Sequence, residues 1–296
     1  MRNSVSNIKH RKKLSALHLA PYLFIMPAII YIFCVTIIPI LMALPISFTD
    51  WSAYTPERSF IGLENYKRLF ADVDFLKSLG VTAQFLLYVP LVMITGLGIA
   101  CLLNASIKGI KFFRVVFYAP VITSTVAAAV LFEWFYQPAF GLFNNILRTI
   151  GLQGIGWVTD ASTAVLSVMI FKIWKGFGVA MLIYLAGLQD VPGEVREAAS
   201  IDGASGWQAF KYITFPLLRP AHIYLLITNV ITVFMIFQET YMFKGPLAST
   251  DTVVNYIYEK GFSGEMGYAC AMSFILFLIV LVFTLIQKKA TKMDLM

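Results

Sequence analysis

Charged residues are scarce in this sequence. Asp, Glu, Lys and Arg together make up 13% of its 296 residues, about half of the share found in soluble domains. Hydrophobic residues make up 59% of the chain, and the mean hydropathy is +0.77. So few charges cannot cover a water-exposed surface, whereas a lipid-facing surface needs none. The composition therefore excludes a soluble globular domain and predicts an integral membrane protein.

The sequence also lacks the residue patterns of an enzyme or a metalloprotein. Its cysteines are Cys34, Cys101 and Cys270. All three lie inside apolar runs without the spacing of metal ligands or of a disulfide framework, so we expect small core side chains. No Ser/His/Asp constellation is present. His10, His18 and His222 are expected near the inner membrane interface, where hydration accounts for them.

No phosphate-binding loop of the form G-x-x-x-x-G-K-[ST] occurs in the sequence. The chain is therefore not expected to hydrolyse ATP or to act as an enzyme. Energy for any transport would come from another polypeptide or from an ion gradient.

What the sequence does contain is long uncharged runs. A helix needs about 20 apolar residues to cross the hydrocarbon core, and no charged residue occurs from Leu14 to Thr49 or from Ser78 to Ile107. The first run is much longer than the core of a cleaved signal peptide, so we expect a permanent span. The pattern predicts an all-α polytopic membrane protein with six transmembrane helices, at roughly residues 20–47, 79–103, 113–136, 162–187, 220–243 and 267–287.

Lys and Arg residues are unevenly divided between the two sides of these spans. The side with both termini and the loops at 108–114 and 190–219 has fourteen of them, and the other side has seven. Because positive residues accumulate on the cytoplasmic side, both termini are expected there. The predicted organisation is a basic cytoplasmic segment (1–19), a six-helix transmembrane domain (20–288) with a cytoplasmic loop at 190–219, and a short cytoplasmic tail (289–296).

The loop at 190–219 is unusually polar and rich in small residues. It begins with Asp190-Val191-Pro192-Gly193-Glu194, where proline and acidic residues suit the start of a helix. Small side chains follow at helical spacing, and Gly203 and Gly206 are expected to end or bend the helix. Small residues let another backbone approach closely, and acidic groups can bond a partner's Arg or Lys. The loop is therefore either a docking surface for a cytoplasmic protein or an ordinary solvated helix.

The same loop resembles the EAA loop of ABC importer permeases. The resemblance lies in Glu197-Ala198-Ala199-Ser200-Ile201-Asp202-Gly203-Ala204, in the later Phe210, Ile213 and Pro216, and in its place before the penultimate span. Other segments are similar to the sugar permease branch, which includes the maltose transporter subunits. They extend over nearly the full length: FIGLENYKRLF (60–70), RVVFYAP (114–120), GLFNNIL (141–147), IWKGFG (173–178) and LAGLQDVPGEVREAASIDGA (185–204).

This resemblance implies a subunit of a heteromeric importer in the bacterial plasma membrane. A second permease would complete the pathway, two ATPase subunits would hold ATP and Mg, and an extracytoplasmic binding protein would deliver a sugar or oligosaccharide. No cofactor, metal or nucleic acid is expected on this chain itself. The residues implied in docking the ATPase are Glu197, Ala198, Ala199, Asp202, Gly203 and Pro216.

Polar residues inside spans are candidates for the substrate pathway, because such groups usually face a bundle interior or a water-filled cavity. Asn229, Thr232, Ile236 and Glu239 are spaced 3-4-3 on the fifth span, and Gln238 lies beside this stripe. Gln84 and Tyr88 are i,i+4 neighbours on the second span and are expected to point inward. The alternative for Glu239 is a position near the outer interface, where it would simply meet water.

Lys172 and Lys175 flank Trp174 near the middle of the fourth span. They are interpreted as cavity contacts or as partners in an interhelical ion pair with Glu239 or Glu133. The alternative is a structural role, bonding backbone carbonyls at a helix break near Gly176 and Gly178. Where the family often has T-G-G-G-P, this chain has Phe243-Lys244-Gly245-Pro246, so no pocket residue is carried over beyond position 240.

The leading hypothesis is a carbohydrate importer permease that works by alternating access. A permease of the same machinery for a non-sugar solute, such as glycerol phosphate, is one alternative. An ion-coupled secondary transporter is another, but such a carrier needs no docking loop for an ATPase.

Overall fold

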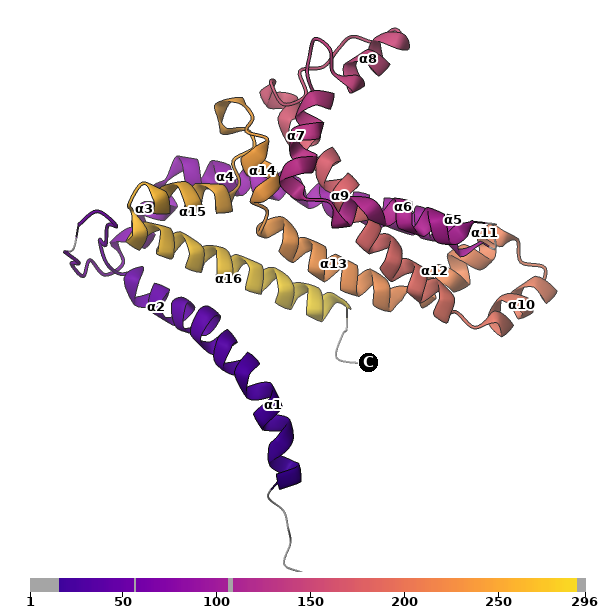
Figure 1. Ribbon diagram of the computed structural model, residues 1–296, viewed down its shortest axis with the longest axis horizontal. Helices are drawn as coiled ribbons and strands as arrows, with labels where there is room; N and C mark the ends of the chain where they lie inside the picture. Colours follow the sequence, from indigo (N-terminus) through magenta and orange to yellow (C-terminus); the bar gives the residue numbers. More distant parts are fainter. Residues whose placement is uncertain (1–15, 56, 106–108, 292–296) are drawn as a thin grey trace, which may run out of the picture.

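The computed structural model describes residues 16–55, 57–105 and 109–291 (Figure 1). Most of the expected N-terminal cytoplasmic segment and the last five residues of the expected tail lie outside these ranges. Regular structure in the described ranges is helical, apart from one isolated antiparallel bridge between Thr49 and Phe60. The all-α expectation is confirmed.

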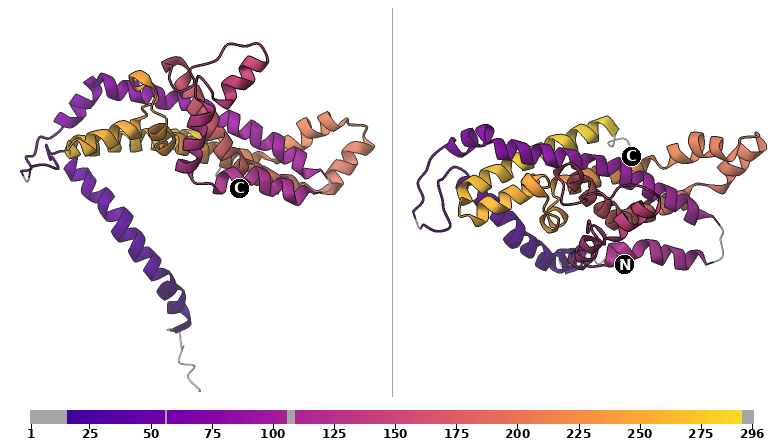
Figure 2. Two further views of the ribbon diagram at one scale, coloured as in Figure 1. Left: turned by 45° about the horizontal axis from the view of Figure 1, so that its top comes forward. Right: turned by 90° about the horizontal axis from the view of Figure 1, so that it is seen from above.

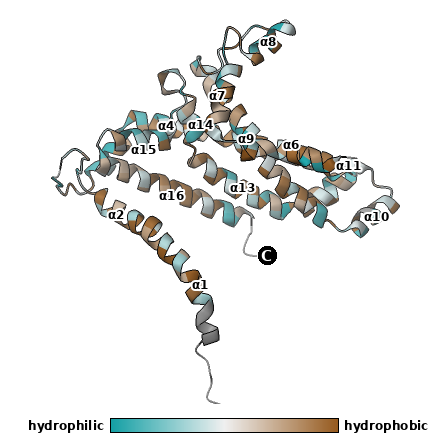
Figure 3. Cartoon of the chain, viewed as in Figure 1, coloured by the Kyte–Doolittle hydropathy of each residue, from teal (hydrophilic) through white to brown (hydrophobic). Residues whose placement is uncertain are grey.

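The first span stands apart from the rest of the bundle. It consists of α1 (Ala16–Ile32), a π-helical turn (Phe33–Ile37) and α2 (Ile38–Ile46). Its apolar stretch, Pro21–Ile46, is mostly hydrophobic and has no residue buried within the chain (Figure 3). Only α2 comes close to another long helix, α16 (Met266–Thr291), while α1 diverges from the bundle.

The second and fourth spans form the centre of the bundle. The second contains α4 (Val73–Gln84), a tight turn (Phe85–Leu87) and α5 (Tyr88–Asn104), and the fourth is α9 (Ala161–Asp190). Glycine allows α5 and α9 to approach closely, because a Cβ atom on Gly96 would lie 2.5 Å from the Cβ of Ala180. These two helices provide the frame on which the polar groups described below are arranged.

The third span is broken, where the sequence predicted one helix at 113–136. It consists of α6 (Ile110–Ile122) and α7 (Thr125–Phe135), which meet at an angle of 96°. Thr123 is extended, with φ −71° and ψ 147°, and Ser124 caps α7 by accepting a hydrogen bond from the Ala127 amide. A side-chain cap of this kind starts a new helix and so fixes the corner.

The fifth span is also interrupted. After α13 (Arg219–Phe234), the chain leaves helical geometry and resumes in α14 (Gln238–Met242). The Thr252 hydroxyl donates to the Ile236 carbonyl at 2.9 Å and so satisfies one backbone group of the break. With α16 as the sixth span, the described residues contain five helical stretches long and apolar enough to cross a membrane and one bent pair, in agreement with six crossings.

Shorter helices lie at the ends of the bundle. At one end are α3 (Glu64–Ala71), α15 (Val253–Phe262) and a 3₁₀ turn (Pro246–Ala248), while α8 (Leu142–Thr149) projects beyond α7. At the opposite end lie α10 (Gly193–Ile201), α11 (Gly206–Ala209), a π-helical turn (Phe210–Thr214) and α12 (Phe215–Leu217) (Figure 2). The loop at 190–219 is thus separated from α3 and α15 by the length of the bundle.

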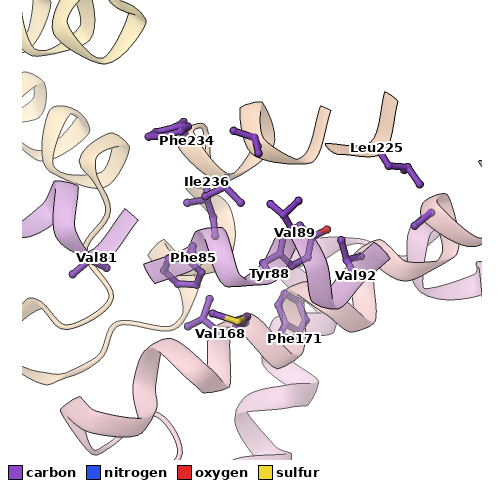
Figure 4. Close-up of a cluster of buried hydrophobic side chains, with 14 of the residues drawn as sticks. Val81, Phe85, Tyr88, Val89, Val92, Val168, Phe171, Leu225, Phe234 and Ile236 are labelled. Atoms are coloured by element: carbon purple, nitrogen blue, oxygen red, sulfur yellow. The ribbon is translucent and has the colours of Figure 1, made fainter. Parts of the chain in front are cut away.

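An apolar core joins the second, fourth and fifth spans. Figure 4 shows Phe85 and Tyr88 between Phe171 of α9 and Ile236 near the end of α13. Phe85 and Phe171 are fully buried, and Tyr88 is 3% exposed. Because this core surrounds the helix breaks, it holds the polar groups near them in defined positions.

Candidate translocation site and coupling loop

A polar cavity of about 320 Å³ lies where the second, fourth and fifth spans meet. Its walls come from α5, α9, α13 and α14, so every wall is a span or part of one. The polar residues that line it are Tyr88, Lys172, Lys175, Tyr224, Thr228, Asn229, Thr232 and Glu239. A cavity with convergent polar groups in an otherwise apolar bundle is the expected form of a small-molecule site.

An ion pair between Lys172 and Glu239 crosses this cavity. Lys172 Nζ donates to Glu239 Oε1 at 3.0 Å, and the two side chains are only 5% and 18% exposed. The ammonium also lies 5.1 Å from the centre of the Tyr88 ring. Of the two partners considered for the lysines, Glu239 is therefore the one found, and Glu133 lies elsewhere. Removing one member of such a buried pair would leave the other charge uncompensated.

Lys175 lines the same cavity but bonds to the corner of the third span. Its Nζ donates to the carbonyl oxygens of Thr123 at 2.6 Å and Pro120 at 2.9 Å. These carbonyls belong to the end of α6, where a helix leaves backbone acceptors without partners. The expected structural role for a lysine is thus found for Lys175. The expected break near Gly176 and Gly178 is wrong, because α9 is continuous there and the break lies in the neighbouring span.

The two glycines serve close packing instead. A Cβ atom on Gly176 would lie 2.2 Å from the Tyr88 hydroxyl oxygen, and one on Gly178 would lie 2.7 Å from a methyl carbon of Val121. They allow the second and third spans to approach α9 beside the cavity.

Asn229, Thr232 and Glu239 line the cavity together, but Ile236 does not. The break between α13 and α14 changes the register of the fifth span, so Ile236 is 2% exposed within the apolar core. Asn229 Nδ2 donates to the Leu225 carbonyl at 2.8 Å, and the Thr232 hydroxyl donates to the Thr228 carbonyl at 2.8 Å. Each donor is thus used within the helix, and the side-chain oxygen can accept a further bond.

Two predicted pathway residues lie outside the cavity. Gln84 and Gln238 are both exposed and belong to none of its walls. The tight turn at Phe85–Leu87 lies between Gln84 and Tyr88 and interrupts the α-helix. The two residues therefore do not lie on the same helix face, and only Tyr88 points into the bundle. Gln238 is displaced because it opens a new short helix instead of continuing α13.

The loop at 190–219 forms a short helical elbow. Gly203 has a φ of +77°, which reverses the chain between α10 and α11, and a capping box of Ser205 and Gln208 starts α11. Large apolar side chains remain uncovered, with Ile201 81% and Trp207 69% exposed. Of the residues implied in docking, Glu197, Ala198, Asp202, Gly203 and Pro216 are exposed, and Ala199 is buried.

His222 connects this elbow to the fourth span, which the sequence did not indicate. Its Nδ1 atom lies 2.9 Å from the Tyr184 hydroxyl, and its Nε2 atom lies 3.1 Å from the Phe215 carbonyl oxygen. Because a carbonyl can only accept, Nε2 carries the proton and neutral Nδ1 accepts from Tyr184. The expectation that hydration alone explains His222 is therefore wrong. The only feature of the sequence that bears on His222 is Pro220, two residues earlier, which marks the start of the fifth span.

Comparisons with known proteins agree with this architecture. The family model described as binding-protein-dependent transport system inner membrane component matches residues 14–291. The chain is 36% identical over 298 residues to the probable ABC transporter permease protein YesP of Bacillus subtilis, covering 98% of this chain and 96% of the relative. It is 33% identical to the trehalose/maltose transport system permease protein MalF of Thermococcus litoralis, covering 97% of each.

Among solved structures, a chain of a bacterial ABC transporter for import of the acidic polysaccharide alginate has a similar fold. The TM-score is 0.83 at 23% identity, over 95% of this chain and 97% of the other. The fold, the bundle of apolar spans and the match over nearly the whole chain agree with one another. This chain is therefore a membrane permease subunit and belongs to the family of binding-protein-dependent transport system inner membrane components.

Proposed function

We propose that this chain forms half of the translocation pathway of an ATP-driven importer for carbohydrates. Similar proteins carry names of sugar systems, including the trehalose/maltose MalF, an arabinooligosaccharides permease AraP and a lactose permease LacF. The structural observation that carries the proposal is the polar cavity at the junction of three spans, with Lys172 paired to Glu239 and Lys175 bonded to backbone carbonyls.

The bonding within the cavity favours an uncharged, hydroxyl-rich ligand. Lys172 is paired with Glu239, and Lys175 is held by carbonyl oxygens of the third span. Among the residues described, a phosphate group would have to compete with Glu239 and with backbone carbonyls for these two ammonium groups, which favours a neutral solute over glycerol phosphate. Glu239, Asn229 and the threonines supply oxygen atoms that can pair with sugar hydroxyls, and tyrosine rings supply apolar faces.

The elbow is proposed to dock an ATPase subunit. Its exposed carboxylates at Glu197 and Asp202 suit charge-assisted bonds, and its exposed apolar side chains suit a cleft in a partner. In this proposal a second permease completes the pathway, and a binding protein delivers the sugar from outside. Two ATPase subunits hold ATP and Mg, this chain binds no cofactor or metal, and both termini lie in the cytoplasm.

His222 offers a route from the elbow to the cavity. The elbow bonds through Phe215 to His222, which bonds to Tyr184 on α9, and α9 also carries Lys172 and Lys175. Docking and closure of the ATPase would therefore act on the helix that carries both cavity lysines, as alternating access requires.

The test is uptake by the intact importer in proteoliposomes, assembled with its partner permease, ATPase subunits and binding protein. Labelled trehalose, maltose, lactose, arabinotriose and glycerol 3-phosphate would be offered. We expect ATP-dependent uptake of at least one sugar, and Glu239→Ala should weaken its apparent affinity more than it weakens ATPase binding. Equal loss of both would assign Glu239 a structural role. Uptake of glycerol 3-phosphate alone, or uphill transport without the ATPase subunits, would overturn the proposal.

A further inference from the structure

A second cavity, of about 410 Å³, lies between α7, α14 and the segment that precedes α9. It is at the far end of α13 from the elbow, since α13 begins beside α12 and leads into α14. The residues that line it are Glu133, Tyr136, Gln137, Pro138, Val158, Thr159, Met242, Phe243 and Lys244. None of them was predicted to contact substrate.

Several polar side chains of this cavity have no hydrogen-bond partner among the described residues. Within the described ranges, Glu133 and Lys244 form no ion pair, and the side chains of Glu133, Gln137 and Thr159 form no hydrogen bond. Lys244 makes only a contact with the Tyr241 ring, 5.2 Å from its centre. The first cavity differs, because its lysines are both satisfied by the protein. A carboxylate, an amide, a hydroxyl and an ammonium, none of them hydrogen-bonded within the described residues, can donate to and accept from the hydroxyl groups of a neutral sugar.

Aromatic rings separate this cavity from the first. Tyr136 and Phe243 line it, with ring centres 5.8 Å apart, and Phe243 packs against Phe171 at 5.0 Å. Phe171 immediately precedes Lys172, which lies in the first cavity. The Tyr136 hydroxyl donates to the Ser167 carbonyl at 2.7 Å, so its ring is held in place. Tyr136 and Phe243 are only 3% and 1% exposed, so these packed rings form a rigid floor of the second cavity and a wall between the two sets of polar groups.

The short helix α14 connects the two cavities. Glu239, in its first turn, lines the first cavity, whereas Met242, Phe243 and Lys244, at its end, line the second. Glu239 and Met242 lie three positions apart, which corresponds to about 4.5 Å along the helix, and Phe243 and Lys244 follow Met242 directly. A ligand in the second cavity is therefore about one short helix away from the Lys172–Glu239 pair.

We infer that the second cavity is an outer subsite for a neutral carbohydrate, occupied before the sugar reaches the Lys172–Glu239 cavity. Glu133, Gln137 and Lys244 contact its hydroxyl groups, and Tyr136 and Phe243 form the fixed base of the subsite. This inference rests on the proposed function, since it names a further contact of the same transported ligand.

The experiment compares Glu133→Gln and Lys244→Gln with wild type in the intact importer in proteoliposomes. Uptake of the sugar that wild type transports best, among trehalose, maltose, lactose and arabinotriose, would be measured over a range of concentrations of the loaded binding protein. Matched controls are Glu259→Gln and Lys67→Gln, which remove the same charges from exposed positions on α15 and α3.

We expect KM for uptake to rise about tenfold in each cavity variant, as loss of one or two hydrogen bonds would give, and to stay unchanged in both controls. Affinity for the sugar-free binding protein should equal that of wild type in all four variants. Unchanged KM in the cavity variants would overturn the inference, as would weakened docking of the sugar-free binding protein. Failure of the proposed function is distinguishable, because wild type itself would then transport none of the four sugars.

Discussion

Lys175 of α9 and Thr123 at the corner of the third span are joined by a hydrogen bond of 2.6 Å from the lysine Nζ to the threonine carbonyl oxygen. A second bond of 2.9 Å reaches the Pro120 carbonyl. In a hydrocarbon environment an unsatisfied backbone group costs several kcal/mol. The ammonium of Lys175 therefore donates the hydrogen bonds that backbone amides of a continuing helix would have donated to these carbonyls.

Lys175→Met should destabilise the corner without changing which sugar is transported. We expect a loss of about 2 kcal/mol, the cost of losing charge-assisted bonds to two backbone carbonyls, visible as a lower Tm of the detergent-solubilised importer. Faster amide exchange should be confined to the segment around residues 121–127. Lys175→Arg keeps the charge and should recover part of the stability. A changed sugar preference at wild-type Tm would instead make Lys175 a substrate contact.

Gly203→Trp should abolish coupling to the ATPase while leaving membrane insertion intact. A Cβ atom at Gly203 would meet nothing within 4 Å in this chain, so a large side chain is accommodated locally and would obstruct only a partner. The positive φ of Gly203 adds strain of about 1 kcal/mol for an ordinary residue.

Gly203→Asn separates these two effects, because asparagine tolerates positive φ and is small. It should retain most ATP-dependent uptake and ATPase binding, both measured on the purified complex. Unaltered uptake by Gly203→Trp would show that the elbow does not seat in a partner.

The end of the bundle opposite the elbow should weaken at acid pH. Asp72 accepts hydrogen bonds from the hydroxyls of Tyr268 and Tyr256, at 2.6 and 2.9 Å, and from the amides of Phe75 and Asp74. Burial alone would raise the pKa of Asp72, but the bonds from Tyr268, Phe75, Tyr256 and Asp74 outweigh it and lower that pKa below its usual value.

Because its pKa is lower in the folded state, the Asp72 carboxylate contributes stability that is complete above its ordinary pKa. That contribution is lost as the pH falls through the lowered value. Thermal unfolding measured from pH 7 down to about pH 3 should show this loss in wild type. Asp72→Asn should be less stable at pH 7 and show a smaller pH dependence, whereas Asp74→Asn, at an exposed neighbour, should follow wild type. Parallel curves for wild type and Asp72→Asn would contradict this role.

The number and order of the spans could be predicted from the sequence because apolar runs of sufficient length are a local property. The breaks could not, because each depends on a partner distant in sequence. At the first break, the carbonyl of the non-helical Thr123 is satisfied by Lys175, which lies more than fifty residues later in the sequence. At the second break, the carbonyl of Ile236 accepts a hydrogen bond from the Thr252 hydroxyl in place of a helical backbone amide. Neither proline nor glycine stands at these two positions to indicate the break.

The candidate site could be predicted only in part, because the helix breaks change which residues share a face. Asn229, Thr232 and Glu239 were correctly expected to lie together, although the helical stripe from which they were read is interrupted at Ile236. Gln84 and Gln238 were assigned by continuing an ideal helix through a tight turn and through a break. The second cavity could not be predicted because Glu133 on the third span and Lys244, just beyond the fifth, are more than a hundred residues apart in the sequence.

The first span does not contribute to the apolar core that the other spans form. No residue of Pro21–Ile46 belongs to the apolar core, and the other spans close that core among themselves. Since lipid tails are as apolar as leucine, such a helix is stable in a bilayer without neighbours in its own chain. The packing of this chain therefore requires of the first span only that it remain apolar, and replacing it with an unrelated hydrophobic helix should leave the apolar core of the other spans undisturbed.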